Sequence, residues 1–182
     1  LEYAKSKGIQ TIDTAHSYGN SESHIGKFKN FNFKIITKIP EINSSKKDAY
    51  KLVREYTLSS INNLNVKKIE AILLHAPEQL LESNGVYIYN ALLDLKEENV
   101  ISKIGISVYD PNVVNEILKK YKIELVQAPI NILDKRFLDK TILKKLRENN
   151  IHIHARSVFL QGLLLNIDNL PIYFKKWESI FK

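Results

Sequence analysis

Short apolar runs alternate with longer amphipathic stretches along most of the chain. The short runs are rich in β-branched residues and nearly continuously apolar, which is typical of parallel strands that are covered on both faces. They predict six strands, at residues 9–13, 33–38, 69–75, 103–108, 125–130 and 151–157. Strands that alternate in this way with helices indicate repeated βα units around a parallel sheet.

The stretches between these runs predict helices. The clearest spans residues 46–64, because Leu52, Val53, Tyr56, Ile61 and Leu64 share one face and Ser45 with Asp48 can cap its first turn. Further helices are expected at 22–28, 86–98, 112–121 and 138–149. An opening helix should end at Gly8, and one more amphipathic helix should follow Pro171, with apolar positions at Ile172, Phe174, Trp177, Ile180 and Phe181. No linker divides the chain, so a single domain over residues 1–182 is expected.

Two α/β architectures produce this alternation: a doubly wound sheet and a (β/α)8 barrel. No Gly-x-Gly-x-x-Gly motif follows any predicted strand, so the dinucleotide fingerprint of the doubly wound fold is missing. The chain has 182 residues, whereas a complete barrel usually needs about 250. We therefore expect an incomplete (β/α)8 TIM barrel that lacks its first strand and its last strand-helix unit.

Composition excludes several other classes of protein. There is no cysteine, so disulfides and cysteine metal sites are ruled out, and no apolar run approaches the roughly 20 residues that would cross a membrane. The formal charge is +7, but the lysines are scattered on helix faces in pairs such as Lys119–Lys120 and Lys144–Lys145. We expect a cytoplasmic protein with no nucleic-acid or membrane partner, whose positive charge favours an anionic ligand.

Three predicted strands end in groups that can carry out proton chemistry. Asp13, Lys38 and His75 each close an apolar run, and Tyr18 follows Asp13 by one short loop. Each residue alone has a local explanation, such as a backbone cap or a solvated strand end, but working groups of parallel βα folds gather where strands end. An ammonium beside a carboxylate is expected to lower the pKa of a nearby phenol, so that Tyr18 can protonate a developing alkoxide while neutral His75 donates a hydrogen bond.

At these residues the sequence resembles the aldo-keto reductase family, including its bacterial branches. The similar segments are residues 8–15, 18–22, 37–38, 73–77, 95–96 and 104–109, which together span most of the chain. The resemblance implies a (β/α)8 barrel that binds NADPH and reduces an aldehyde or ketone by hydride transfer. Asp13, Tyr18, Lys38 and His75 match the family's catalytic tetrad.

The resemblance also implies residues that bind the cofactor. Ser107 and Gln127 match positions that hold the nicotinamide carboxamide, and Ser157 begins a loop, with Phe159 and Leu160, on the side of the diphosphate. The chain departs from the family pattern at two positions. Val108 stands where many members have asparagine, and Arg156 stands where many stack a tyrosine on the nicotinamide, although a planar guanidinium can also lie over a ring.

Other functions remain open from the sequence. Lys38 could form a Schiff base, as in an aldolase, or the fold could serve a cofactor-sensing or regulatory protein. His152 and His154 alternate along one strand as zinc ligands can, but no third ligand accompanies them, so no metal is expected. The particular carbonyl substrate and the oligomeric state are not encoded in these patterns.

Overall fold

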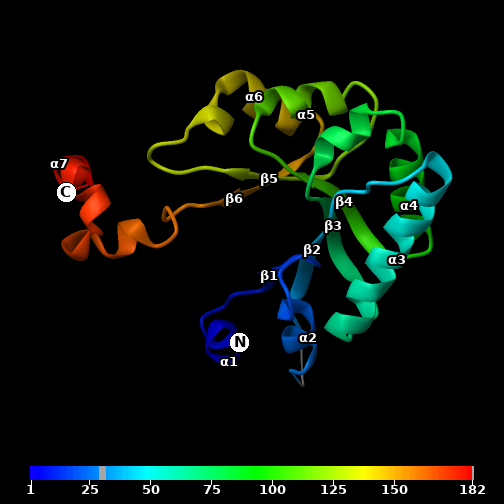
Figure 1. The fold of residues 1–182 in the computed structure, drawn as a ribbon, viewed down its shortest axis with the longest axis horizontal. Helices are drawn as coiled ribbons and strands as arrows, with labels where there is room; N and C mark the ends of the chain where they lie inside the picture. The colour runs from blue at the N-terminus through cyan, green and yellow to red at the C-terminus, as the bar shows by residue number, and fades with distance from the viewer. Residues whose placement is uncertain (29–31, 182) are drawn as a thin grey trace.

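The computed structural model describes residues 1–28 and 32–181, which form one six-stranded parallel sheet (Figure 1). The strands follow one another across the sheet in chain order: β1 (Thr11–Asp13), β2 (Lys34–Ile39), β3 (Ile69–Leu74), β4 (Ile101–Ser107), β5 (Leu125–Pro129) and β6 (His152–Arg156). All six predicted strands are present. Each pairs in parallel with the next, which confirms an α/β fold of alternating strands and helices.

A contact between β1 and β5 demonstrates that the sheet is curved. Three strands separate these two, so in a flat sheet they would lie roughly 19 Å apart at the usual spacing. Yet the side-chain amide of Gln127 on β5 donates to the carboxylate of Asp13 on β1 at 2.8 Å. The sheet is therefore a half-barrel whose inward-facing side chains meet.

Helices cover the outer face of the half-barrel (Figure 1). These are α3 (Lys46–Leu64), α4 (Gly85–Glu97), α5 (Pro111–Ile117) and α6 (Lys140–Glu148), with α1 (Glu2–Ser6) and α2 (Ser21–Gly26) at the first strands. Helix α3 has the predicted bounds, and Ser45 Oγ accepts from the backbone nitrogen of Asp48 at 3.4 Å, as expected of its cap. Gly8 follows α1 with φ of 79°, which is the predicted end of the opening helix.

Three of the predicted helices are shorter in the structure, one of them α6, which spans Lys140–Glu148 rather than 138–149. The helix expected to reach residue 121 ends at Ile117 and passes into a turn, and α2 ends at Gly26 rather than at Phe28. At Gly26 the chain lies so close to α3 that a Cβ atom would fall 2.2 Å from the carbonyl oxygen of Asn63. Close backbone packing therefore holds α2 against α3 at this glycine.

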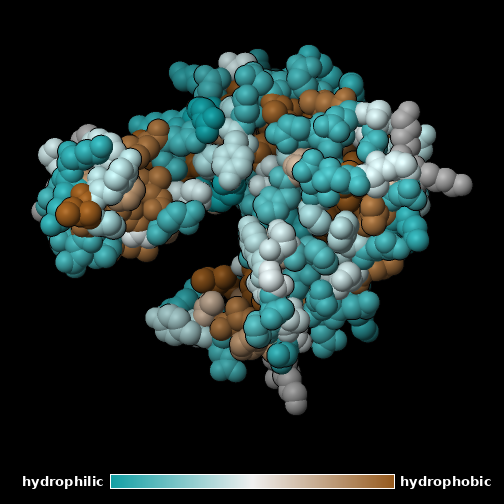
Figure 2. All heavy atoms as spheres, in the orientation of Figure 1, coloured by the Kyte–Doolittle hydropathy of each residue, from teal (hydrophilic) through white to brown (hydrophobic). Residues whose placement is uncertain are grey.

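The predicted tail helix is wrong in form. The structure has a 3-10 helix at Ile172–Trp177 followed by the short helix α7 (Glu178–Phe181). Ile172 is 88% exposed and Tyr173 is 65% exposed, so this segment lacks the apolar contacts that stabilise most helices. The segment after β6 leads away from the sheet, and apolar atoms show on its surface (Figures 1 and 2). The side chains of Ile180 and Phe181 and residue 182 lie outside the part that the structure describes.

The core has two parts, one on each face of the sheet. The large cluster packs the outward-facing side chains of the strands, such as Ile72 and Ile104, against α3, α4, α5 and α6. The small cluster lies on the inner face and consists of Ile36, Ala71, Leu73 and Leu125. The polar side chains of the inner face lie at the two ends of the half-barrel, on either side of this small cluster. Within the described residues, no helix is long and apolar enough to cross a membrane.

Candidate active site

The predicted strand-end residues meet at the carboxyl ends of the strands. Lys38 is the centre of the group, with its side chain 1% exposed. Its ammonium donates to Asp13 Oδ2 at 2.8 Å and to the backbone oxygen of Thr14 at 2.8 Å. The ammonium also lies 5.2 Å from the centre of the Tyr18 ring, and that ring meets the His75 ring edge-on at 6.1 Å. The structure thus brings all four predicted catalytic residues together.

The loop that carries Tyr18 is anchored to β2. The backbone nitrogen of Thr14 donates to Ile36 and that of His16 donates to Lys38, so the loop continues the parallel ladder past the end of β1. Gly19, with φ of 56°, then allows the turn into α2, because this left-handed conformation is costly for other residues. Backbone bonds therefore hold the loop of Tyr18 close to Lys38.

A buried carboxylate behind the tetrad supports the same loop. Glu22 is 3% exposed and accepts from the Thr37 hydroxyl at 2.7 Å and from the Asn63 amide at 3.4 Å. Thr37 precedes Lys38 on β2 and points to the opposite face, so Glu22 connects α2 to the outer side of the strand that carries the lysine. The sequence analysis assigned Glu22 no role, although it lies in the segment that carries the family resemblance.

The local charges do not change the phenol in the expected direction. The pKa of Tyr18 is raised from its ordinary value of 10.0, first by burial and then by the negative charge of Asp13, while Arg156 acts in the opposite direction. The net lowering of the Tyr18 pKa that was expected from the sequence is therefore wrong. The physical reason is that burial of the phenol and the negative charge of Asp13 outweigh the positive charges at the mouth.

Burial also changes the two basic groups. The pKa of Lys38 is lowered from 10.5, mainly by burial, even though its hydrogen bond and charge interaction with Asp13 act to raise it. The pKa of His75 is lowered from 6.5 by burial and by the positive charges of Lys38 and Arg156. His75 is consequently neutral near pH 7, as the sequence analysis expected of a hydrogen-bond donor.

The predicted cofactor residues occupy neighbouring strand ends at the same mouth. Ser107 and Gln127 pair across β4 and β5, and both side chains are about 5% exposed. Within the described residues the Ser107 hydroxyl has no hydrogen-bond partner, whereas the Gln127 amide nitrogen donates to Asp13. Arg156 ends β6, and its guanidinium stacks on the ring of Tyr109, 3.9 Å from the ring centre. Tyr109 is a contact that the sequence analysis missed.

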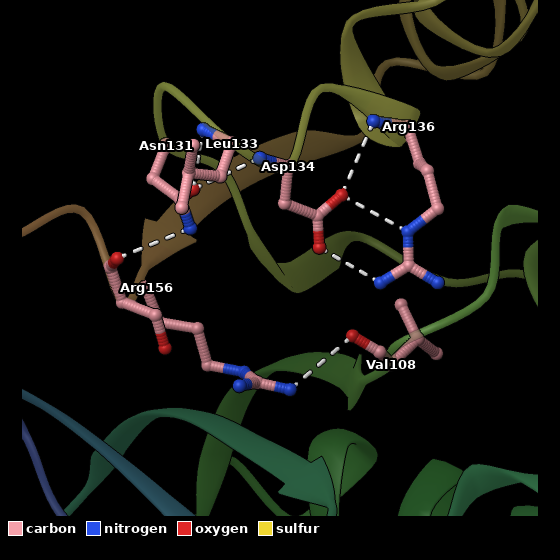
Figure 3. A network of polar contacts seen from close by, with 7 residues as sticks. Val108, Asn131, Leu133, Asp134, Arg136 and Arg156 are labelled. Atoms are coloured by element: carbon pink, nitrogen blue, oxygen red, sulfur yellow. Dashed lines mark hydrogen bonds and ion pairs between the residues drawn. The ribbon is translucent and has the colours of Figure 1, made fainter. Parts of the chain in front are cut away.

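The loop after β6 has an unusual backbone. Ser157, Leu160 and Gln161 all have positive φ, with values of 55°, 49° and 57°. Ser157 therefore lies outside the strand that was predicted to include it, since a left-handed residue cannot continue a strand. Phe159 is 54% exposed, and Asn131 holds the start of the loop by donating to the Ser157 carbonyl oxygen (Figure 3). The loop is thus open to a ligand above the sheet.

The opposite end of the strands has a different character. Thr11, Lys34, Lys103, His152 and His154 line a cavity of about 200 Å³ there, in which Lys103 pairs with Glu70 at 2.8 Å. No group of three or more His, Asp or Glu side chains that could hold a metal ion occurs within residues 1–28 and 32–181. The reactive groups are therefore concentrated at the carboxyl ends, where catalytic groups of barrel enzymes lie.

A parallel half-barrel that carries a lysine-carboxylate pair, a tyrosine and a histidine at one mouth belongs to the class of α/β barrel folds, and its side chains are of types suited to proton transfer. Comparison with known families identifies the class: residues 1–179 match the Aldo/keto reductase family. The chain belongs to this family, which is a family of oxidoreductases.

Two curated relatives are similar in sequence. The chain is 31% identical over 112 residues to the uncharacterized oxidoreductase YqkF of Bacillus subtilis, a match that covers 62% of the chain and 35% of the relative. It is also 31% identical over 125 residues to the uncharacterized oxidoreductase C28F2.05 of Schizosaccharomyces pombe, covering 63% of the chain and 43% of that protein.

Solved structures agree in fold. The holo form of aldo-keto reductase AKR11C1 from Bacillus halodurans superposes with a TM-score of 0.77 at 24% identity, over 94% of the chain and 59% of that protein. An aldo-keto reductase from Klebsiella pneumoniae in complex with NADPH gives a TM-score of 0.74 at 18% identity, over 91% of the chain and 58% of that protein. The chain therefore spans less than two thirds of these relatives.

Proposed function

We propose that the protein reduces an aldehyde or ketone to an alcohol with NADPH, and that Tyr18 is the proton donor. The observation that carries this proposal is the group formed by Asp13, Tyr18, Lys38 and His75, because all four side chains lie at one mouth of a reductase-family fold. A raised pKa keeps Tyr18 protonated near neutral pH, so the phenol can deliver a proton to the carbonyl oxygen as negative charge develops there.

The other three residues support that proton transfer. Lys38 and Asp13 place a paired charge beneath the Tyr18 ring, and the ammonium stabilises the phenolate that remains once the proton has left. The Ser17 hydroxyl lies 3.4 Å from His75 Nδ1. When Ser17 donates this bond, the proton of the neutral imidazole is on Nε2, where it can bond to the carbonyl oxygen and orient the substrate.

The residues at the mouth fit a nicotinamide cofactor, which when bound would supply the hydride. Ser107 has an unpartnered hydroxyl, and Gln127 uses its amide nitrogen for Asp13. The Gln127 Oε1 oxygen is left to accept from a carboxamide. One face of the Arg156 guanidinium stacks on Tyr109, and the opposite face would be left to stack on the nicotinamide ring. The loop with Ser157, Phe159 and Leu160 would hold the diphosphate side.

A Schiff-base mechanism is less well supported by the same geometry. A lowered pKa favours a reactive amine, and Lys38 has one. However, Lys38 is 1% exposed and already donates to Asp13 and Thr14, so a substrate carbonyl has no approach to its nitrogen. Borohydride trapping of an aldehyde on Lys38 would favour the aldolase-like alternative.

Substitution of Tyr18 by phenylalanine tests the proposal. In the full-length protein, Tyr18→Phe should abolish NADPH oxidation with a panel of aldehydes and ketones, while NADPH binding, followed by fluorescence, stays close to that of the wild type. Tyr3→Phe is the matched control, since Tyr3 is 75% exposed on α1. Equal turnover in Tyr18→Phe would contradict the assigned role. Binding of NADPH with no oxidation by the wild type would instead favour a cofactor-sensing protein.

A further inference from the structure

Arg156 carries a positive charge that the half-barrel does not neutralise. The guanidinium is partly buried, and its Nε atom is fully covered without a hydrogen-bond partner. Its hydrogen bond within the described residues is one of 3.4 Å to the carbonyl oxygen of Val108. An arginine has five N–H donors, and covering a charge without a partner costs free energy. A group that satisfies these donors is therefore to be expected.

The carboxylates at the mouth do not supply that group. The pKa of Asp134 is lowered mainly by its hydrogen bonds to Arg136 and least by the charge of Arg156, and both of its oxygens bond to Arg136, at 2.9 and 2.7 Å (Figure 3). Asp13 uses one oxygen for Lys38 and the other for Gln127. Neither carboxylate therefore bonds to Arg156, and its guanidinium has no ion pair among the described residues.

The position of Arg156 relates this charge to the reacting groups. Arg156 ends β6, and its guanidinium bonds to the carbonyl oxygen of Val108, which directly follows β4. It therefore lies at the carboxyl mouth, where its charge also acts on Tyr18, Lys38 and His75. Stacking on Tyr109 holds the plane of the guanidinium. Because Nε is covered and Nη2 already bonds to Val108, the Nη1–Nη2 end is the edge that is left to bond two oxygens of one anion. A planar fork of this kind matches a carboxylate or a phosphate better than it matches a neutral oxygen.

We propose that Arg156 binds a carboxylate or phosphate group carried by the carbonyl substrate, so that the protein prefers anionic aldehydes and ketones to neutral ones. This inference rests on the proposed reductase function and specifies its substrate class. Tyr109 is the positioning residue for the guanidinium. The anion lies on the Arg156 side of the mouth while the carbonyl oxygen faces Tyr18 and His75.

Matched pairs of substrates test the inference. Succinic semialdehyde and its methyl ester differ by one carboxylate charge, and glycolaldehyde phosphate differs from glycolaldehyde by a phosphate that carries about −1.5 to −2 near neutral pH. The wild type should show a higher kcat/KM for the anionic member of at least one pair. Arg156→Gln should lower this anionic-to-neutral ratio by roughly 10- to 100-fold, the usual effect of a lost hydrogen-bonded charge. Using a ratio removes any effect on NADPH binding that both members share.

Further variants separate recognition from net charge. Arg147→Gln on α6 removes the same charge at an exposed site and should leave the ratio as in the wild type. Arg156→Lys should lose much of the preference because a lysine keeps the charge but not the planar fork. Tyr109→Phe should retain the preference and Tyr109→Leu should reduce it. Thermal unfolding of every variant establishes that it is folded.

Several outcomes would overturn the inference. If Arg156→Gln weakens NADPH binding but leaves the ratio unchanged, the anion belongs to the cofactor. If the anionic-to-neutral ratio falls equally in Arg147→Gln and Arg156→Gln, the preference comes from the overall positive charge of the protein and not from binding by Arg156. If the wild type reduces neutral carbonyls without any preference, the inference fails while the proposed function stands.

A binding measurement keeps the test independent of turnover. If no carbonyl is reduced, the proposed function fails, and an NMR titration with benzoate and with neutral benzamide then decides the anion site alone. Saturable binding of benzoate that is lost in Arg156→Gln supports the site. Equal behaviour of benzoate and benzamide contradicts it.

Discussion

Gln127 donates a hydrogen bond of 2.8 Å to Asp13 across the inside of the half-barrel, although 114 positions separate the two residues in the sequence. Asp13 thus has a partner on each oxygen, with Lys38 on the other at 2.8 Å. The amide fixes the carboxylate that in turn holds the lysine. A residue that the family resemblance assigns to the cofactor is therefore also a positioning residue for the catalytic pair.

Replacement of this amide should impair catalysis in a pH-dependent way. Gln127→Glu places a second carboxylate against Asp13, and two such groups cannot both ionise without strong repulsion. We expect kcat/KM for carbonyl reduction to fall roughly tenfold or more at pH 8 and to recover partly at lower pH, where the two carboxylates share a proton. The pH profile of kcat/KM measures this fall and its partial recovery.

The exposed Gln10 provides the control for that variant. Gln10→Glu makes the same chemical change at the other end of β1 and should keep the wild-type profile. Gln127→Leu lacks the amide donor but adds no charge. Its fall in kcat/KM should therefore not recover at lower pH. An identical profile for Gln127→Glu and Gln127→Leu would show that repulsion at Asp13 is not the cause.

The Tyr18 phenol should titrate above pH 10.0. Its pKa is raised by burial and by Asp13, so the phenol remains protonated over the whole range in which a reductase would work. The chain has nine tyrosines, so the tyrosinate absorbance of Tyr18→Phe must be subtracted from that of the wild type to isolate one titration. A difference curve with its midpoint at or below 10.0 would contradict the expected direction.

The Lys38 ammonium should affect the pH at which the Tyr18 phenol titrates. Lys38→Met removes the ammonium and leaves the Asp13 charge beside the phenol without compensation, so the Tyr18 midpoint should rise further. Lys34→Met changes an exposed lysine at the start of the same strand and serves as the control. Because Lys38 is fully buried, circular dichroism is needed to establish that Lys38→Met is folded. An unchanged midpoint in a folded variant would show that the ammonium does not act on the phenol.

The positions of the proposed catalytic groups were predictable from the sequence, because a polar residue that closes an apolar run must lie at a strand end. The same reasoning located Asp13, Lys38 and His75 and placed Tyr18 one loop away. The direction of the Tyr18 pKa was not predictable, since it depends on how far the phenol is buried and on how its neighbours, Asp13 and Arg156, are placed around it. That balance is a property of the packed site.

The supporting contacts could not be predicted for a different reason. The bond between Gln127 and Asp13 exists only because the sheet curves, and curvature leaves no periodic signal in the sequence. The stacking of Arg156 on Tyr109 joins residues from the ends of β4 and β6, which are not neighbours in the sheet. The amphipathic pattern of the tail did not give the expected single helix, and its apolar side chains at Ile172 and Tyr173 are exposed.

Stability should decline as the pH falls below about 6.5, partly because of His75 and His154. The folded-state pKa of each is lowered from 6.5, mainly by burial, so below this pH the unfolded chain binds protons that the folded chain does not. The unfolding free energy therefore rises with pH through the window below 6.5 and levels off above it. Urea unfolding at about pH 7.5 and about pH 5.5 measures the change.

Histidine variants assign this pH dependence. The double variant His75→Gln/His154→Gln should show a smaller fall in unfolding free energy between those two pH values than the wild type. His24→Gln, at an exposed position on α2, controls for the loss of a histidine as such. If the double variant loses as much stability on acidification as the wild type, other groups account for the pH dependence.

Gly105 should be intolerant of even one additional methyl group. It lies on the inner face of β4, where a Cβ atom would fall 2.2 Å from Cδ2 of Leu73 and 2.7 Å from the carbonyl oxygen of Leu125. The leucine side chain can shift, but the carbonyl belongs to the β4–β5 pair that sets Ser107 opposite Gln127. We expect Gly105→Ala to lower the unfolding free energy by about 1–3 kcal/mol, as overpacking usually does.

A second substitution identifies which contact is responsible. Leu73→Ala removes the Cδ2 atom and opens space on the inner face, so the double variant Leu73→Ala/Gly105→Ala should cost less than the sum of the two single changes. It should still be less active than Leu73→Ala alone, because the Leu125 carbonyl must move and carries Gln127 with it. Urea unfolding and kcat/KM together decide the case. Full additivity in stability with unchanged activity would mean that the strands accommodate the methyl group without moving the site.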